Sequence, residues 1–162
     1  MRKPVKITAF VFSIYLLLTF YVCGGGMVTS LVDYRIWKLV GPNEFPKFHQ
    51  ADNARIIPVF VIFFFLSFVP QILLLRFRPP IIPKWMVWLG LFLNSIMLIS
   101  SITIQIPIQM KLDKEFSLEL IERLISTDLT FRVLPMILLA VTNFVMLYKV
   151  VKNDSNSFEN PH

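Results

Sequence analysis

The sequence predicts an all-α membrane protein: a four-transmembrane-helix bundle with a short amphipathic helix between spans 3 and 4. Hydrophobic residues make up 56% of the 162 residues, more than in an ordinary soluble domain. They gather in four stretches, each close to the length that crosses a hydrocarbon layer of about 30 Å as a helix. Short connections leave room for one domain, 1–152, and the polar composition of 153–162 predicts a disordered tail. The spans are expected at about 7–32, 56–75, 85–108 and 133–148.

The first span begins like a secretory signal. Basic Arg2, Lys3 and Lys6 precede an apolar run that reaches Cys23 and three glycines. Apolar residues continue to Val32, which is too long for a signal core. We therefore expect a retained, tilted helix.

Cysteine and histidine counts exclude several redox classes. Cys23 is the only cysteine, so the chain has no intramolecular disulfide, no Cys-x-x-Cys pair and no thiolate zinc site. One of the two histidines, His162, lies in the polar tail, which argues against a haem held between two histidines. We expect no metal and no cofactor.

The second helix is expected to begin outside its apolar run. Asn43 before Glu44-Phe45-Pro46 is typical of a helix start. In such a helix His49, Asp52 and Asn53 share a face. A histidine beside a carboxylate could be a general base or a single metal ligand, although no recognisable metal signature surrounds it. The alternative is an exposed or capping histidine.

The third span carries polar residues on one face. Asn94, Ser101, Gln105 and Gln109 recur at helical spacing. Unpaired amides in hydrocarbon are costly, so this face is expected to point into the bundle. Pro107 frees a backbone carbonyl in the same turn. The face could be interhelical glue or, at Gln105 and Gln109, part of a ligand cradle.

Between the third and fourth spans, apolar residues recur at helical spacing from Asp113 to Ser126, with charged residues on the remaining surface. This pattern predicts a short amphipathic helix lying on or over the bundle. Thr127 or Asp128 is then expected to cap the fourth span.

Arg132 opens the fourth span, where an unpaired arginine would cost a few kcal/mol. It could snorkel to the interface or form an i, i+4 pair with Asp128. Alternatively, its guanidinium could clamp a carbonyl-bearing or anionic ligand.

The net charge of +6 does not indicate a nucleic-acid partner, because the basic residues lie at the ends of spans and form no stripe. The turn from Arg76 to Lys84 is short, basic and free of acids, which favours an N-in, C-in topology. Aromatic residues flank the spans and are expected to form interfacial belts: Tyr34, Trp37, Trp85 and Trp88.

Several short motifs carry a resemblance. They are Trp37-x-x-Val40-Gly41, Glu44-Phe45, Phe48-His49, Arg76-Phe77-Arg78-Pro79-Pro80, Gln105-x-Pro107-x-Gln109, and Thr127 with Arg132. Their order resembles small bacterial four-span membrane proteins of unknown function and, more distantly, the anthrone-oxygenase-like family. The resemblance implies a four-helix bundle in the bacterial inner membrane. For a few fungal relatives it implies oxidation of polyketide anthrones to quinones without a bound metal or flavin, but it identifies no catalytic residue in this chain.

Two functions follow from these patterns. The first is the binding of a lipid-soluble aromatic or quinone-like molecule in a polar pocket at the non-cytoplasmic end, lined by His49, Asn53, Gln105, Gln109 and Arg132. The second is a non-catalytic scaffold or partner subunit whose polar face binds another membrane protein or a second copy. Ion-coupled transport is disfavoured because no span carries a central charge.

Overall fold

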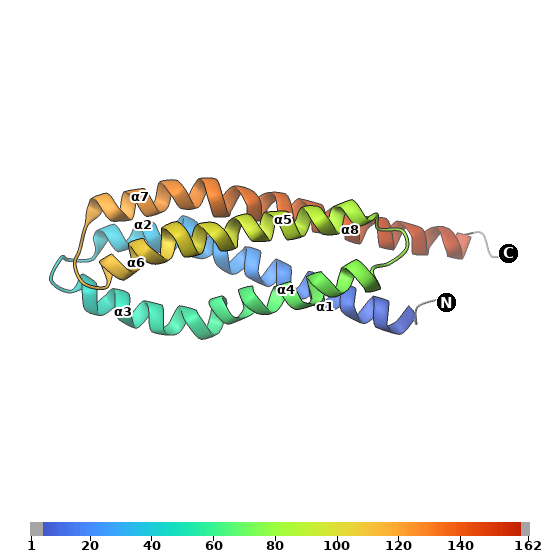
Figure 1. Ribbon diagram of the computed structural model, residues 1–162, viewed down its shortest axis with the longest axis horizontal. Helices are drawn as coiled ribbons and strands as arrows, with labels where there is room; N and C mark the ends of the chain where they lie inside the picture. Colours follow the sequence, from blue (N-terminus) through green and yellow to red (C-terminus); the bar gives the residue numbers. More distant parts are fainter. Residues whose placement is uncertain (1–4, 160–162) are drawn as a thin grey trace.

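The computed structural model describes residues 5–159. Four long helices lie side by side along one axis, and both ends of the chain lie at the same end of the bundle (Figure 1). We call this the terminal end, which also holds the turn at residues 78–83. The opposite end, with the connections at 40–44 and 113–117, is the loop end.

Each long helix consists of two α-helical parts joined by a π-helical turn. The first is α1 (Val5–Val28), η1 (Thr29–Asp33) and α2 (Tyr34–Ile36), followed by the 3-10 turn η2 (Trp37–Leu39). The second is α3 (Phe45–Ile56), η3 (Ile57–Val61) and α4 (Ile62–Phe77). The third is α5 (Lys84–Ser100), η4 (Ser101–Gln105) and α6 (Ile106–Leu112). The fourth is α7 (Leu118–Asp128), η5 (Leu129–Val133) and α8 (Leu134–Glu159).

All four helices are long and apolar enough to cross a membrane, which confirms the predicted fold class. The candidate spans are Lys6–Leu39, Phe45–Phe77, Lys84–Leu112 and Leu118–Asp154. Large apolar side chains cover their outward faces, for example Phe10, Phe92 and Phe144, which are 67, 62 and 63% exposed. Apolar surface on four helices of this length is typical of contact with lipid, and the protein is an integral membrane protein.

The amphipathic helix is present as α7, but it is continuous with the fourth span. Ser117 caps it by accepting a hydrogen bond from the Leu120 backbone N–H. The expected cap at Thr127 or Asp128 is absent. The Thr127 hydroxyl instead donates to the carbonyls of Arg123 and Leu124, and no proline or glycine separates α7 from η5. Nothing local stops the helix, so α7 extends the span instead of lying across the bundle.

The disordered tail at 153–162 stays a prediction, although part of this segment belongs to the last helix. α8 continues as a helix through Glu159, and residues 160–162 lie outside the described part. Low hydrophobicity predicts that a segment lacks a packed core. It does not prevent the extension of a helix that is already nucleated, because each added residue gains one backbone hydrogen bond.

The π turns have local causes. Proline lacks a backbone N–H and disrupts the normal helical ladder. Pro58 lies inside η3, while Pro107 and Pro135 follow η4 and η5 by two residues. At η1, Arg35 Nη1 donates at 2.9 Å to the carbonyls of both Ser30 and Leu31. All four turns lie on the loop-end side of the bundle's middle. They therefore interrupt the regular α-helical hydrogen-bond pattern of the four helices at a similar level.

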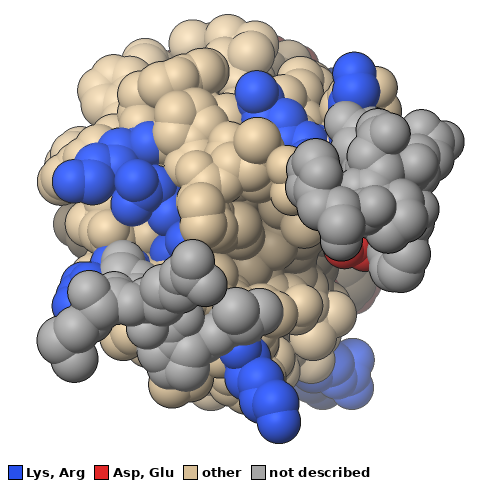
Figure 2. Space-filling model, turned by 90° about the vertical axis from the view of Figure 1, so that its right-hand side faces the viewer, with Lys and Arg blue, Asp and Glu red and all other residues tan. Residues whose placement is uncertain are grey.

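Charge is distributed unevenly between the ends. Figure 2 shows lysine and arginine side chains around the terminal end, with little acidic surface in view. Its described basic residues are Lys6, Arg76, Arg78, Lys84, Lys149 and Lys152. A basic end is typical of the cytoplasmic side. The N-in, C-in orientation and the inner-membrane location remain predictions.

Candidate functional site

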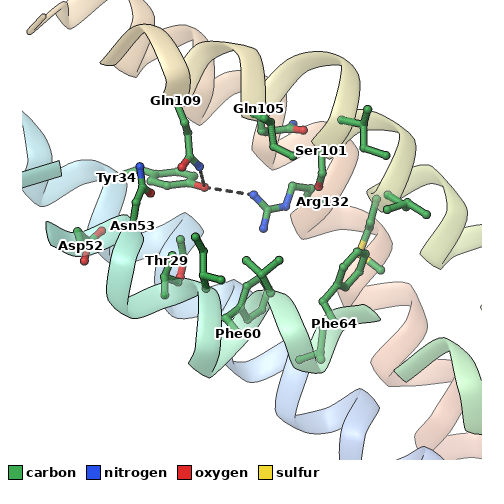
Figure 3. Close-up of a pocket in the computed structure, with 18 of the residues that line it drawn as sticks. Thr29, Tyr34, Asp52, Asn53, Phe60, Phe64, Ser101, Gln105, Gln109 and Arg132 are labelled. Atoms are coloured by element: carbon green, nitrogen blue, oxygen red, sulfur yellow. Dashed lines mark hydrogen bonds between the residues drawn. The ribbon is translucent and has the colours of Figure 1, made fainter. Parts of the chain in front are cut away.

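A cavity of about 390 Å³ lies in the loop-end half, beside the four π turns (Figure 3). This volume is within the usual range of small-molecule sites. All four long helices contribute to its wall, which is mostly apolar. Its polar lining residues are Thr29, Tyr34, Asp52, Asn53, Ser101, Gln105, Gln109, Asp113 and Arg132.

Arg132 points into this cavity and joins a short polar chain. Its Nη1 donates to the Tyr34 hydroxyl at 3.1 Å, and Gln109 Nε2 donates to the same oxygen at 3.2 Å. The Tyr34 hydroxyl accepts both bonds, so its own proton is left to donate. Arg132 also forms the predicted i, i+4 pair with Asp128, at 2.9 Å. The guanidinium charge is therefore balanced within the fourth helix. We name Tyr34, Gln105, Gln109, Asp128 and Arg132 the pocket layer.

Gln105 differs from Asp128 of the same layer: both oxygens of Asp128 lack a hydrogen bond but its carboxylate forms an ion pair with Arg132, whereas Gln105 has neither kind of partner in the part of the chain that the structure describes. It is 1% exposed and lines the cavity, yet neither its amide nitrogen nor its amide oxygen finds a hydrogen-bond partner among the described residues. Leaving a buried polar group unpaired costs about 1–3 kcal/mol. The wall of the cavity thus contains an amide that could donate and accept hydrogen bonds and does neither within the described residues.

His49 lies behind the wall of the cavity and does not line it. It is fully buried, stacked on Phe45 and edge-on to Trp37. Its Nδ1 lies 2.7 Å from Asp113 Oδ1, an atom that also accepts from Asn53 Nδ2 at 3.0 Å. We call His49, Asn53 and Asp113 the clasp, because they join α3 to the connection after α6.

The cavity opens sideways toward lipid. The second and third long helices are in contact where α4 packs on α5 and again at the clasp. Between these two contacts, half-exposed apolar side chains of both helices surround an opening. These rim residues are Ile57, Phe65, Ile102, Ile106 and Met110, between 49 and 61% exposed. Phe60 and Phe64 rise from the second helix beneath Arg132 (Figure 3). A molecule dissolved in the bilayer could reach the polar groups without crossing water.

Four of the five candidates from sequence line the cavity: Asn53, Gln105, Gln109 and Arg132. Sequence reasoning missed Tyr34, which was assigned to an interfacial belt. Tyr34 is 1% exposed and holds the centre of the polar chain. The available signal was helical spacing, since Tyr15, Thr19, Ser30 and Tyr34 all lie on the buried face of the first long helix.

A second polar cluster lies nearer the terminal end; its Asn94 was predicted to point into the bundle, whereas Tyr15, Gln71 and Asn143 were missed. Tyr15 donates to Asn143 Oδ1 at 2.6 Å, and Asn94 Nδ2 donates to Gln71 Oε1 at 2.5 Å. A methyl group on Gly90 would lie 2.8 Å from Gln71 Nε2 and 3.2 Å from the Tyr15 hydroxyl, so these groups are closely packed. We name Tyr15, Gln71, Asn94 and Asn143 the packed layer.

No group of three or more histidine, cysteine, aspartate or glutamate side chains within residues 5–159 is placed to hold a metal ion. Comparisons with protein-family models, with curated proteins and with solved structures find no match. The resemblance to the anthrone-oxygenase-like family therefore stays an expectation.

Proposed function

We propose that this membrane protein binds a lipid-soluble aromatic or quinone-like molecule in the cavity that opens between its second and third long helices. The observation that carries the proposal is Gln105, whose buried amide has two unpaired atoms and belongs to the wall of an apolar cavity that opens to lipid. A ligand oxygen accepting from Gln105 would offset the desolvation cost of the amide.

The donors around the cavity favour a ligand with a carbonyl oxygen. The free proton of Tyr34, the Gln105 amide and the remaining guanidinium N–H groups of Arg132 all donate. Because Asp128 already balances the charge of Arg132, an anionic ligand would leave an excess negative charge in a region of low dielectric. A neutral carbonyl avoids this cost. The rings of Phe60 and Phe64 offer the matching apolar surface.

Fluorescence of Trp37 tests the proposal, because this residue lines the cavity and is 2% exposed. Trp85 and Trp88 lie on α5, near the terminal end, and are replaced by phenylalanine to leave Trp37 alone. In detergent, a decyl-substituted benzoquinone should quench Trp37 with a saturable dependence on concentration. Gln105→Leu should weaken this binding about tenfold, which corresponds to one lost hydrogen bond of about 1.4 kcal/mol.

Thr103→Val is the matched control. Thr103 belongs to the same π turn, is exposed, and donates to the Ile99 carbonyl away from the cavity. It should leave quenching unchanged. Quenching that rises linearly, without saturation, and equally in both variants would refute binding in the cavity.

The alternative of a scaffold or partner subunit remains a prediction. A scaffold would be favoured by an Arg132 side chain that points to water and a Gln105 amide that bonds a neighbouring helix. Gln105 makes no such bond within the described part of the chain, so the geometry favours the ligand.

A further inference from the structure

A second hollow, of about 610 Å³, runs along the lipid-facing surface between the first and second long helices. It lies on the other side of η3 from the cavity and shares with it a wall of four residues, Thr29, Asp52, Ile56 and Phe60. We call it the groove. The Tyr21 hydroxyl donates to the Val59 carbonyl at 2.6 Å and thereby ties the two helices together.

Charged and apolar residues follow one another along the groove in a defined order. Asp33 and Asp52 lie nearest the loop end, and Arg55 follows one helical turn deeper on the second helix. Val28 and Val59, 55 and 58% exposed, come next. Farther toward the bundle's middle the lining is apolar or without a side chain: Phe20, Tyr21, Gly24 and Gly25.

Gly24 lines the groove at a position where a side chain would have space. A methyl group on Gly26 would lie 2.5 Å from Met136 Sδ, so packing inside the bundle accounts for that glycine. A methyl group on Gly24 would meet nothing within 4 Å. The protein's own packing does not require a glycine there, and the open space lies in the groove.

We propose that the groove binds a phospholipid with an amine headgroup, of the phosphatidylethanolamine type. From water inward, such a lipid presents an ammonium group, a phosphate and then acyl chains, which is the order of its complements in the groove. The ammonium lies against Asp33 and Asp52, and the phosphate against Arg55. An acyl chain lies on Val28 and Val59 and against the bare backbone at Gly24.

The charged residues of the groove favour this lipid over other classes of phospholipid. Asp33, Asp52 and Arg55 together carry one excess negative charge, which disfavours a lipid with a net negative headgroup such as phosphatidylglycerol. Phosphatidylcholine carries the phosphate for Arg55, but its quaternary ammonium has no N–H to donate to the two carboxylates. The expected order of affinity is phosphatidylethanolamine, then phosphatidylcholine, then phosphatidylglycerol.

Native mass spectrometry of the detergent-solubilised protein tests this order with the three lipids at equal acyl-chain length. Asp33→Asn should reduce the preference for phosphatidylethanolamine over phosphatidylcholine about three- to tenfold, because only the ammonium contact is weakened. Arg55→Gln should reduce binding of both lipids and leave their ratio unchanged. Glu119→Gln and Lys47→Gln remove the same charges from exposed positions outside the groove and should have no effect.

Gly24→Leu supplies a test that does not depend on charge, because its side chain would fill the groove. It should abolish retention of the lipid while leaving Trp37 quenching by the benzoquinone unchanged, so this proposal and the proposed function can fail separately. Equal binding of the three lipids, strongest binding of phosphatidylglycerol, or retention unchanged by Gly24→Leu would overturn the assignment.

Discussion

The packed layer and the pocket layer are both buried polar clusters inside the same apolar bundle, yet they differ in what surrounds them. In the packed layer, Tyr15 bonds Asn143 and Gln71 bonds Asn94 directly, and Gly90 lets the groups approach. The residues of the packed layer line neither the cavity nor the groove. In the pocket layer, Gln105 has both amide atoms unpaired and belongs to the wall of the cavity.

The difference shows that a buried polar residue in a membrane bundle is not in itself evidence of a site. The packed layer also keeps single unpaired atoms, Gln71 Nε2 and Asn143 Nδ2, but these lie in a closely packed region that lines neither the cavity nor the groove. An unpaired group next to accessible volume is the stronger indication. The π turns separate the two cases, since they lie at the pocket layer and not at the packed layer.

The largest expected effect concerns the ion pair of the pocket layer. Asp128 is 1% exposed, and the Arg132 side chain is 11% exposed. Arg132→Met would leave a buried carboxylate unpaired and should lower the free energy of unfolding by about 3–5 kcal/mol. Combining it with Asp128→Leu should restore most of this loss. The midpoint of thermal unfolding in detergent measures both changes.

Arg123→Met serves as the control for this prediction, because Arg123 is exposed on the same long helix. It should change stability by no more than about 0.5 kcal/mol. If Arg132→Met changes stability as little as this control, the pair contributes nothing to the pocket layer.

The sequence predicted the features that depend on length and on periodicity within one helix. Apolar runs located the four spans, and i, i+4 spacing correctly placed Gln105 and Gln109 on one inward face and Arg132 beside Asp128. These relations require no knowledge of neighbouring helices.

Features that depend on contacts between helices were not predictable in this way. The clasp joins His49 to Asp113 across 64 residues, and no local pattern connects the two. Pro107 predicted a freed backbone carbonyl in the third span, but the level at which the four π turns align depends on how the helices pack. Tyr34 was assigned to lipid because an aromatic residue at a span end fits a belt as well as a core.

Two tyrosines provide a direct test of the contrast between the layers. Tyr15→Phe leaves Asn143 Oδ1 without its donor, and Tyr34→Phe removes the oxygen that accepts from Arg132 and Gln109. Each should lower stability by about 0.6–1.7 kcal/mol, the range for hydrogen bonds inside membranes. Only Tyr34→Phe should also weaken benzoquinone quenching of Trp37, by about tenfold. Equal weakening by Tyr15→Phe would mean that the layers are not separate.

The smallest expected changes in stability come from substituting two glutamines of similar burial, and these changes have opposite signs. Gln71→Leu removes the acceptor of the Asn94 amide and should destabilise the bundle by about 1 kcal/mol. Gln105→Leu removes two unpaired polar atoms and adds apolar surface, so it should stabilise the ligand-free protein by about 1 kcal/mol. Thermal unfolding of both variants without quinone measures this difference.

Gln105→Leu provides the stricter test of the proposed site. Gln105→Leu is expected to raise stability and to lower quinone affinity at once, which is the trade-off of a residue kept for binding at a cost to the fold. A structural glutamine would lose stability on the same substitution, because its partners would be left unpaired. A fall in the unfolding midpoint for Gln105→Leu would therefore assign Gln105 to the bundle's own packing and remove the observation that carries the proposed site.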